Sequence, residues 1–164
     1  MIIENSENTT GASGNIRNRN SPLSRESVAD YCRRNYKLLG LRSINDPELP
    51  EVLCADSHTP RRFLALYAQS SESELLELIA SNPNTPESVM AGLAFHYVTS
   101  VRAMAASNKM LSISLSESLA IDESAFVRFA LASNPRSSRL ALELLQKDSN
   151  LWISKRATKT AKGV

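Results

Sequence analysis

The chain has few of the residues on which metal and cofactor sites commonly depend. Its 164 residues include two cysteines, two histidines and five glycines. Cys32 and Cys54 form no Cys-x-x-Cys pair, so the sequence indicates neither a metal cluster nor a disulfide framework. We expect two reduced, buried thiols, no bound metal and no cofactor.

Recognised catalytic patterns are also missing. We expect His58 in a turn and His96 at a helix end, where a solvated histidine is favoured over a metal ligand because neither has partners at matched spacing. The many serines include no Gly-x-Ser-x-Gly elbow, and we interpret them as caps and corner residues. The few glycines form no phosphate-binding loop. The sequence therefore predicts no catalytic residue and no enzyme activity.

Long hydrophobic runs are absent, although 42% of the residues are hydrophobic and can fill one continuous core. No apolar run reaches the roughly 18 residues of a membrane-spanning helix. The start, "MIIENSENTTGASG", lacks the basic segment and the long apolar core of a signal peptide. We expect a soluble, cytoplasmic protein that does not contact a membrane.

Charge is small in total but uneven along the chain. The net charge is +2, yet residues 43–149 hold eight Lys or Arg against thirteen Asp or Glu, a balance of −5. Residues 16–42 hold seven basic residues against two acidic ones, and residues 150–164 hold four against none. An acidic middle is therefore flanked by two basic segments.

The middle of the chain is repetitive. The tripeptide Ala-Ser-Asn occurs at residues 80–82, 106–108 and 132–134, which sets a constant period of 26 residues. A column of mostly small residues in this register predicts close helix packing: Cys54, Ala80, Ala106, Ala132 and Thr158. Apolar residues occupy three more columns: Leu49, Leu75, Val101, Val127 and Ile153; Phe63, Val89, Leu115 and Ala141; Tyr67, Leu93, Leu119 and Leu145.

Each unit contains two short helical segments that meet at the Asn corner. One predicted helix runs from Glu72 to Ala80, and a second follows Thr85 as N-cap, with Pro86 at its first position, to about Phe95. Helices of this length are marginal alone in water. The repeated corner therefore serves to stack equivalent apolar faces into one core.

The repeats suggest four segments. Before the array we expect a helix from Arg25 to about Leu39, ended by Gly40, that covers the open apolar end. At the other end we expect Trp152 to seal the core. The segments are a disordered arm at 1–20, an N-terminal capping helix at 21–45, the helical repeat domain at 46–158 and a basic tail at 159–164.

The stretches "TSVRAMAASN" and "AFVRFALASNP" resemble the variant leucine-rich repeat, a bacterial repeat of short paired helices. The resemblance covers about residues 46–158 and implies an all-α, right-handed superhelical solenoid of about four 26-residue repeats, in which one helix of each pair can be a 3₁₀ turn. One founding member of that family carries an iron–sulfur cluster, but this chain lacks the cysteine set, so no cluster is implied here. The family supplies no catalytic residue to carry over.

Arg102 and Arg128 lie one period apart and have two interpretations. They can form a basic ladder that grips phosphates or acidic side chains, with Arg136 and Arg139 nearby as further partner contacts. Alternatively, each pairs with an acid of its own or the adjacent unit, such as Asp122 or Glu123. For each arginine alone the internal pairing is favoured, because Leu76 and Ser154 do not extend the ladder.

Two functions remain. The first is a non-catalytic protein–protein interaction scaffold that binds another protein through an acidic segment. The alternative is a nucleic-acid-binding repeat protein that uses the basic flanks and the repeat arginines. The acidic array favours the scaffold, because a surface with a balance of −5 repels a polyanion.

Overall fold

The computed structural model describes residues 27–35 and 46–163, in which every element is an α-helix and none is a strand. The all-α prediction is confirmed, whereas the 3₁₀ segments implied by the family resemblance do not occur in these residues. The helices are α1 (Val28–Asn35), α2 (Leu49–Ala55), α3 (Arg61–Tyr67), α4 (Ser73–Ser81), α5 (Glu87–Ala94), α6 (Thr99–Ser107), α7 (Ile113–Leu119), α8 (Ala125–Ser133), α9 (Arg139–Leu145) and α10 (Leu151–Ala161).

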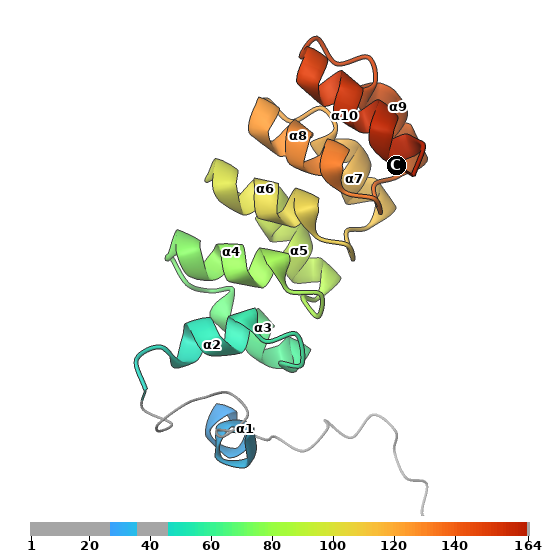
Figure 1. Ribbon diagram of the computed structural model, residues 1–164. Coiled ribbons are helices and arrows are strands. Elements are labelled where there is room, and N and C mark those ends of the chain that lie inside the picture. Colours follow the sequence, from blue (N-terminus) through green and yellow to red (C-terminus); the bar gives the residue numbers. More distant parts are fainter. Residues whose placement is uncertain (1–26, 36–45, 164) are drawn as a thin grey trace, which may run out of the picture.

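The helices after α1 form two rows (Figure 1). Row A consists of α2, α4, α6, α8 and α10, each packed on the next row A helix, and row B consists of α3, α5, α7 and α9. Packing between successive helices is closer in row A than in row B. The small-residue column explains this difference, because its members Cys54, Ala80, Ala106 and Ala132 lie on row A and are fully buried.

The core consists of the apolar columns that the 26-residue register predicts. Leu75, Val101 and Val127 on row A are at most 5% exposed, and Leu93, Leu119 and Leu145 on row B are at most 4% exposed. The predicted burial of these six residues is therefore confirmed. One continuous cluster runs from Cys54 to Ala157.

Helix α4 ends where the sequence predicts, because Asn82 has extended backbone angles. The predicted role of Thr85 is wrong. Its side chain makes no cap on α5 but is buried, and its hydroxyl donates to the carbonyl oxygen of Ile79 near the end of α4. Ser137 makes the equivalent bond to the carbonyl oxygen of Leu131 at 2.7 Å. This position of the repeat satisfies the end of one helix rather than the start of the next.

The ends of the stack differ from each other. At the start, Cys32 of α1 packs with Leu49 and Leu53 of α2 in a second apolar cluster, which Tyr31 and Tyr67 border. The remaining residues of the predicted 25–39 helix, and the arm at 1–20, lie outside the described residues. At the other end, α10 continues to residue 161, so the predicted basic tail at 159–164 begins inside a helix.

Candidate interaction surface

A ladder of asparagine side chains joins consecutive repeats at the C-terminal ends of the row A helices. The Asn108 amide nitrogen donates to the carbonyl oxygens of Ala80 at 2.7 Å and Asn82 at 3.0 Å. The Asn108 Oδ1 accepts from the backbone N–H of Met110 at 2.8 Å, which turns the chain out of the helix. Asn82 and Asn134 repeat both halves of this pattern.

The residues at the two ends of the ladder fit their positions. Asp56 occupies the asparagine position at the start of the ladder, and its Oδ1 accepts from the N–H of His58 at 3.0 Å, which makes the same turn. A carboxylate has no N–H to donate to a preceding repeat, and a turn at this position does not require one. Thr160 stands after the last asparagine, and its hydroxyl donates to the carbonyl oxygen of Ala132 at 2.6 Å. The Asn corner of the sequence is therefore a hydrogen-bonded link between repeats as well as a turn.

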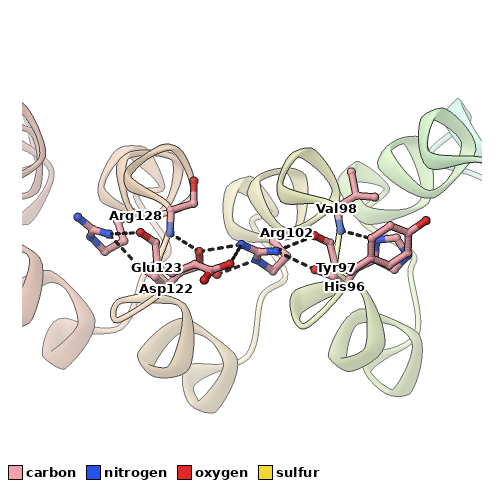
Figure 2. A network of polar contacts seen from close by, with 8 residues as sticks. His96, Tyr97, Val98, Arg102, Asp122, Glu123 and Arg128 are labelled. Atoms are coloured by element: carbon pink, nitrogen blue, oxygen red, sulfur yellow. Dashed lines mark hydrogen bonds and ion pairs between the residues drawn. The ribbon is translucent and has the colours of Figure 1, made fainter.

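A second link joins the repeats at the N-terminal ends of the row A helices (Figure 2). Arg102 Nε donates to Asp122 Oδ2 at 2.8 Å, and Arg102 Nη2 donates to Asp122 Oδ1 at 3.1 Å. On its other side, Arg102 Nη1 donates to the carbonyl oxygens of His96 at 2.9 Å and Tyr97 at 3.2 Å. The guanidinium thus fastens the loop before α6 to the loop before α8.

Arg128 repeats this clamp one unit further on. Its Nε donates to Asp148 Oδ2 at 2.7 Å. Its Nη1 donates to the carbonyl oxygens of Asp122 at 2.8 Å and Glu123 at 3.1 Å (Figure 2). Asp122 therefore belongs to both clamps, through its carboxylate and through its backbone. These contacts raise the pKa of Arg102 and of Arg128, chiefly through the hydrogen bonds to Asp122 and Asp148.

The structure separates the four arginines of the predicted partner site. The Arg102 and Asp122 side chains are each 8% exposed, and Arg128 and Asp148 are 18% and 6% exposed. Arg102 pairs with Asp122 and Arg128 pairs with Asp148 inside the protein, so neither presents a free guanidinium to a partner. Arg136 and Arg139 are exposed on the surface, where Arg139 pairs with Glu143 at 2.8 Å. A contact between these two arginines and a partner stays a prediction.

The histidines and cysteines do not come together as a site. His58 is exposed, as predicted, whereas His96 is half-buried and its Nδ1 accepts from the N–H of Val98 at 3.2 Å. Cys32 and Cys54 are free and buried, as predicted, and burial raises the pKa of the Cys54 thiol to about 12. Within residues 27–35 and 46–163, no group of three or more His, Cys, Asp or Glu is placed to hold a metal ion.

Between the two sets of links lies the solvent-exposed side of row A, which we call the row A face. Three large aromatic side chains stand on it, on the adjacent helices α8 and α10. Phe126 is 59% exposed, Phe129 is 42% exposed and Trp152 is 77% exposed. The predicted sealing role of Trp152 is therefore wrong, because its side chain lies mostly in solvent while Ile153 beside it fills the core.

Full burial of a large apolar side chain gains about 1.5 to 3 kcal/mol over full exposure, so a partner that covered these partly exposed rings would gain part of that free energy. Phe126 and Trp152 occupy the same position of neighbouring repeats, the second residue of α8 and of α10. Phe129 lies three residues after Phe126 and so shares its helix face. The three rings are therefore exposed apolar side chains on two adjacent row A helices.

Sequence reasoning missed this surface, and it interpreted the Asn corner as a turn without predicting its hydrogen bonds between repeats. The sequence placed Trp152 in one column with Phe126, but the prediction gave the Trp152 ring a sealing role at the end of the core. A better signal was the rest of that column, since Glu74 and Ser100 occupy the same position in earlier repeats. Glu74 is exposed and Ser100 is half-buried, so the earlier members of this column already indicate the solvent side of row A.

No helix in the described part of the chain is both long and apolar enough to cross a bilayer. No family model matches the chain, and neither a curated protein nor a solved structure is significantly similar to it. The resemblance to the variant leucine-rich repeat therefore stays a prediction.

Proposed function

We propose that this chain is a non-catalytic scaffold that binds another protein on the row A face. The observation that carries the proposal is the exposure of Phe126, Phe129 and Trp152 on two adjacent helices. Exposed aromatic side chains are the commonest anchors of protein interfaces, where they enter pockets of the partner. The strong polar constellations of the molecule are satisfied internally, which favours a binding role over a catalytic one.

The proposed architecture is a short right-handed solenoid, and it suits this function. The asparagine ladder at the C-terminal ends of the row A helices and the arginine clamps at their N-terminal ends hold successive repeats in a fixed relation. The row A face is therefore a rigid surface. Row A is also packed more tightly than row B. We infer that the stack curves toward row A, and the concave side of a helical solenoid is its usual binding side.

The test is affinity capture with the immobilised full chain and with a Phe126→Ser/Trp152→Ser variant. Both replaced side chains are mostly exposed, so the variant should keep its melting temperature within a few degrees. We expect specific proteins to be retained by the natural chain, lost with the variant and unaffected by nuclease. Equal retention on both chains would contradict the proposed face.

Nucleic-acid binding remains the second candidate because α10 is basic beside exposed aromatic rings. Lys155 and Lys159 are exposed on α10, and Trp152 is in the same helix. Lysines beside stacking aromatics are typical of single-strand binding surfaces. Nuclease-sensitive capture, lost in a Lys155→Ala/Lys159→Ala variant, would support this candidate. Removal of residues 155–164 is a poor test, since it would cut α10 and delete Ala157, which is a fully buried part of the core.

A further inference from the structure

The charges of row A are sorted by sign along the stack. Every charged residue of α2 and α4 is acidic, and the three are Glu51, Glu74 and Glu77. Every charged residue of α10 is basic, and Lys155 and Lys159 among them are exposed. The acidic and basic helices therefore lie at opposite ends of the same row (Figure 1).

The helices between these ends contribute no net charge to the face. Arg102 is the one charged residue of α6 and Arg128 is the one charged residue of α8, and both are held in their ion pairs. What α6 and α8 offer is apolar: Met104 is half-buried, and Phe126 and Phe129 are exposed. The row A face thus passes from acidic through apolar to basic.

One column of the repeat contains residues of both signs. Glu51, Glu77, Phe129 and Lys155 occupy one position of α2, α4, α8 and α10, and the corresponding residue of α6 is Ala103. Equivalent positions of stacked repeats line up, so this column follows the row from α2 to α10. Its members on α2, α4, α8 and α10 reach the surface, whereas Ala103 is 1% exposed, so over α6 the face is formed by other side chains such as Met104. A single segment laid across the row would meet all three zones in order.

We propose that the row A face binds a protein segment of opposed charge: basic residues over α2 and α4, an apolar middle over α6 and α8, and acidic residues over α10. This inference rests on the proposed function and names the partner's chemistry. The exposed rings supply most of the affinity: Phe126 and Phe129 anchor the apolar middle on α8, and Trp152 adds a ring beside the lysines of α10. The charges at the two ends set the direction in which the segment lies.

The span of the face sets the length of the segment. Packed helices lie about 10 Å apart, so the four steps from α2 to α10 cover roughly 40 Å. An extended chain advances about 3.3 Å per residue, so roughly twelve residues would cross the face. A short linear segment of another protein is long enough to reach both charged ends.

Charge complementarity favours such a protein segment over a nucleic acid. A nucleic acid carries the same negative charge along its whole length. It would be attracted by Lys155 and Lys159 but repelled by Glu51, Glu74 and Glu77 at the other end of the row. A segment with opposed charges is attracted at both ends.

The experiment is a selection from a phage-displayed library of random peptides about 16 residues long, panned on the full chain. We expect enriched peptides to share a basic end, an apolar middle and an acidic end in one constant chain direction. Synthetic copies are then measured by fluorescence anisotropy on the natural chain and on a charge-exchanged variant, Glu51→Lys/Glu74→Lys/Lys155→Glu/Lys159→Glu. All four replaced side chains are exposed, so folding is preserved and melting temperature serves as the control.

We expect the charge-exchanged variant to weaken binding about tenfold or more, and peptides with exchanged ends to recover it. A second outcome is that peptides bind the Phe126→Ser/Trp152→Ser variant more weakly but bind the charge-exchanged variant as tightly as the natural chain. That result would overturn the opposed-charge inference and leave the proposed function intact. Peptides indifferent to both variants, or no enrichment at all, would overturn both. Tighter binding by a uridine oligonucleotide than by any selected peptide would show that the face is a nucleic-acid site.

Discussion

Arg102 and Asp122 are twenty residues apart in the chain and form a two-point ion pair, with both side chains 8% exposed. The pair links α6 to the loop before α8, so it stabilises the contact between repeats rather than a single helix. Each partner satisfies the other in a site that water hardly reaches. Loss of either partner therefore leaves a buried charge without compensation.

We predict that Arg102→Leu lowers the free energy of unfolding by about 3 to 5 kcal/mol, because the Asp122 carboxylate stays buried and unpaired. The preceding repeat suggests the control: there Leu76 stands at the arginine position and His96 at the aspartate position. A double variant Arg102→Leu/Asp122→His should recover part of the loss. Urea denaturation measures both values, and a single variant as stable as the natural chain would contradict the clamp.

A change of pH should alter the stability that the Arg128–Asp148 ion pair contributes to the fold. The hydrogen bond from Arg128 holds the pKa of Asp148 below its ordinary value of 3.8. The folded state therefore binds this proton less well than the unfolded state, so the pair contributes its full stability above the unfolded pKa and loses it as the pH falls through the folded pKa. We expect the stability gap between the natural chain and Asp148→Asn to be largest near neutral pH and to narrow below about pH 4.

The control for the pH series is Glu143→Gln. Glu143 pairs with Arg139, but both side chains are mostly exposed, at 50% and 93%. An exposed pair contributes about 0 to 1 kcal/mol, so this variant should follow the natural chain at every pH. A gap for Asp148→Asn that stays constant across the series would mean that the lowered pKa does not contribute to folding.

The asparagine ladder should be sensitive to the chemistry of its side chain. Asn108→Ala removes two donations to buried carbonyl oxygens, and each unpaired group costs about 1 to 3 kcal/mol. Asn108→Asp should cost at least as much, because a carboxylate would face the carbonyl oxygens of Ala80 and Asn82. Asp56→Asn is the matched control and should change the stability little, since position 56 makes the turn without donating. Thermal denaturation of the three variants tests this order.

Truncation of a buried side chain should destabilise the fold much more than truncation of an exposed side chain two residues away. Leu119 is 1% exposed and Ile121 is 77% exposed. We predict that Leu119→Ala costs about 2 to 5 kcal/mol, the range for a buried leucine, and that Ile121→Ala costs less than about 0.5 kcal/mol. Chemical denaturation measures the two losses. Similar losses for both residues would mean that the register of the repeat is wrong.

The two thiols should report on the opening of the first repeats. Cys32 and Cys54 are both 0% exposed, and burial raises the pKa of each thiol. We expect a water-soluble disulfide reagent at pH 8 to label the folded chain far more slowly than the unfolded chain. Cys32 should react before Cys54, because α1 is held by the smaller apolar cluster. Mass spectrometry of partly labelled protein gives the order, and equal rates would contradict a separate opening of α1.

Much of the fold could be predicted from local pattern. The 26-residue register identified the buried positions Leu75, Val101 and Val127, because every repeat must place the same residues against its neighbours. The ends of the helices were predicted to within a few residues, since Asn82 and its equivalents interrupt helix by their own backbone preferences. These features depend on neighbours in sequence and on periodicity, which one chain displays by itself.

The partners of the polar side chains were decided only by the tertiary structure. Asn108 donates to residues 26 and 28 positions earlier, and Arg102 pairs with a residue 20 positions later. The sequence by itself limited Arg102 to a few acidic candidates, but the stacking of repeats selected Asp122. For Trp152, Glu74 and Ser100 of the same column already indicated a position on the solvent side. The tertiary structure showed that the ring follows its column and does not close the end of the core. A residue's own chemistry determines what it can contact, whereas the packing of distant segments determines what it does contact.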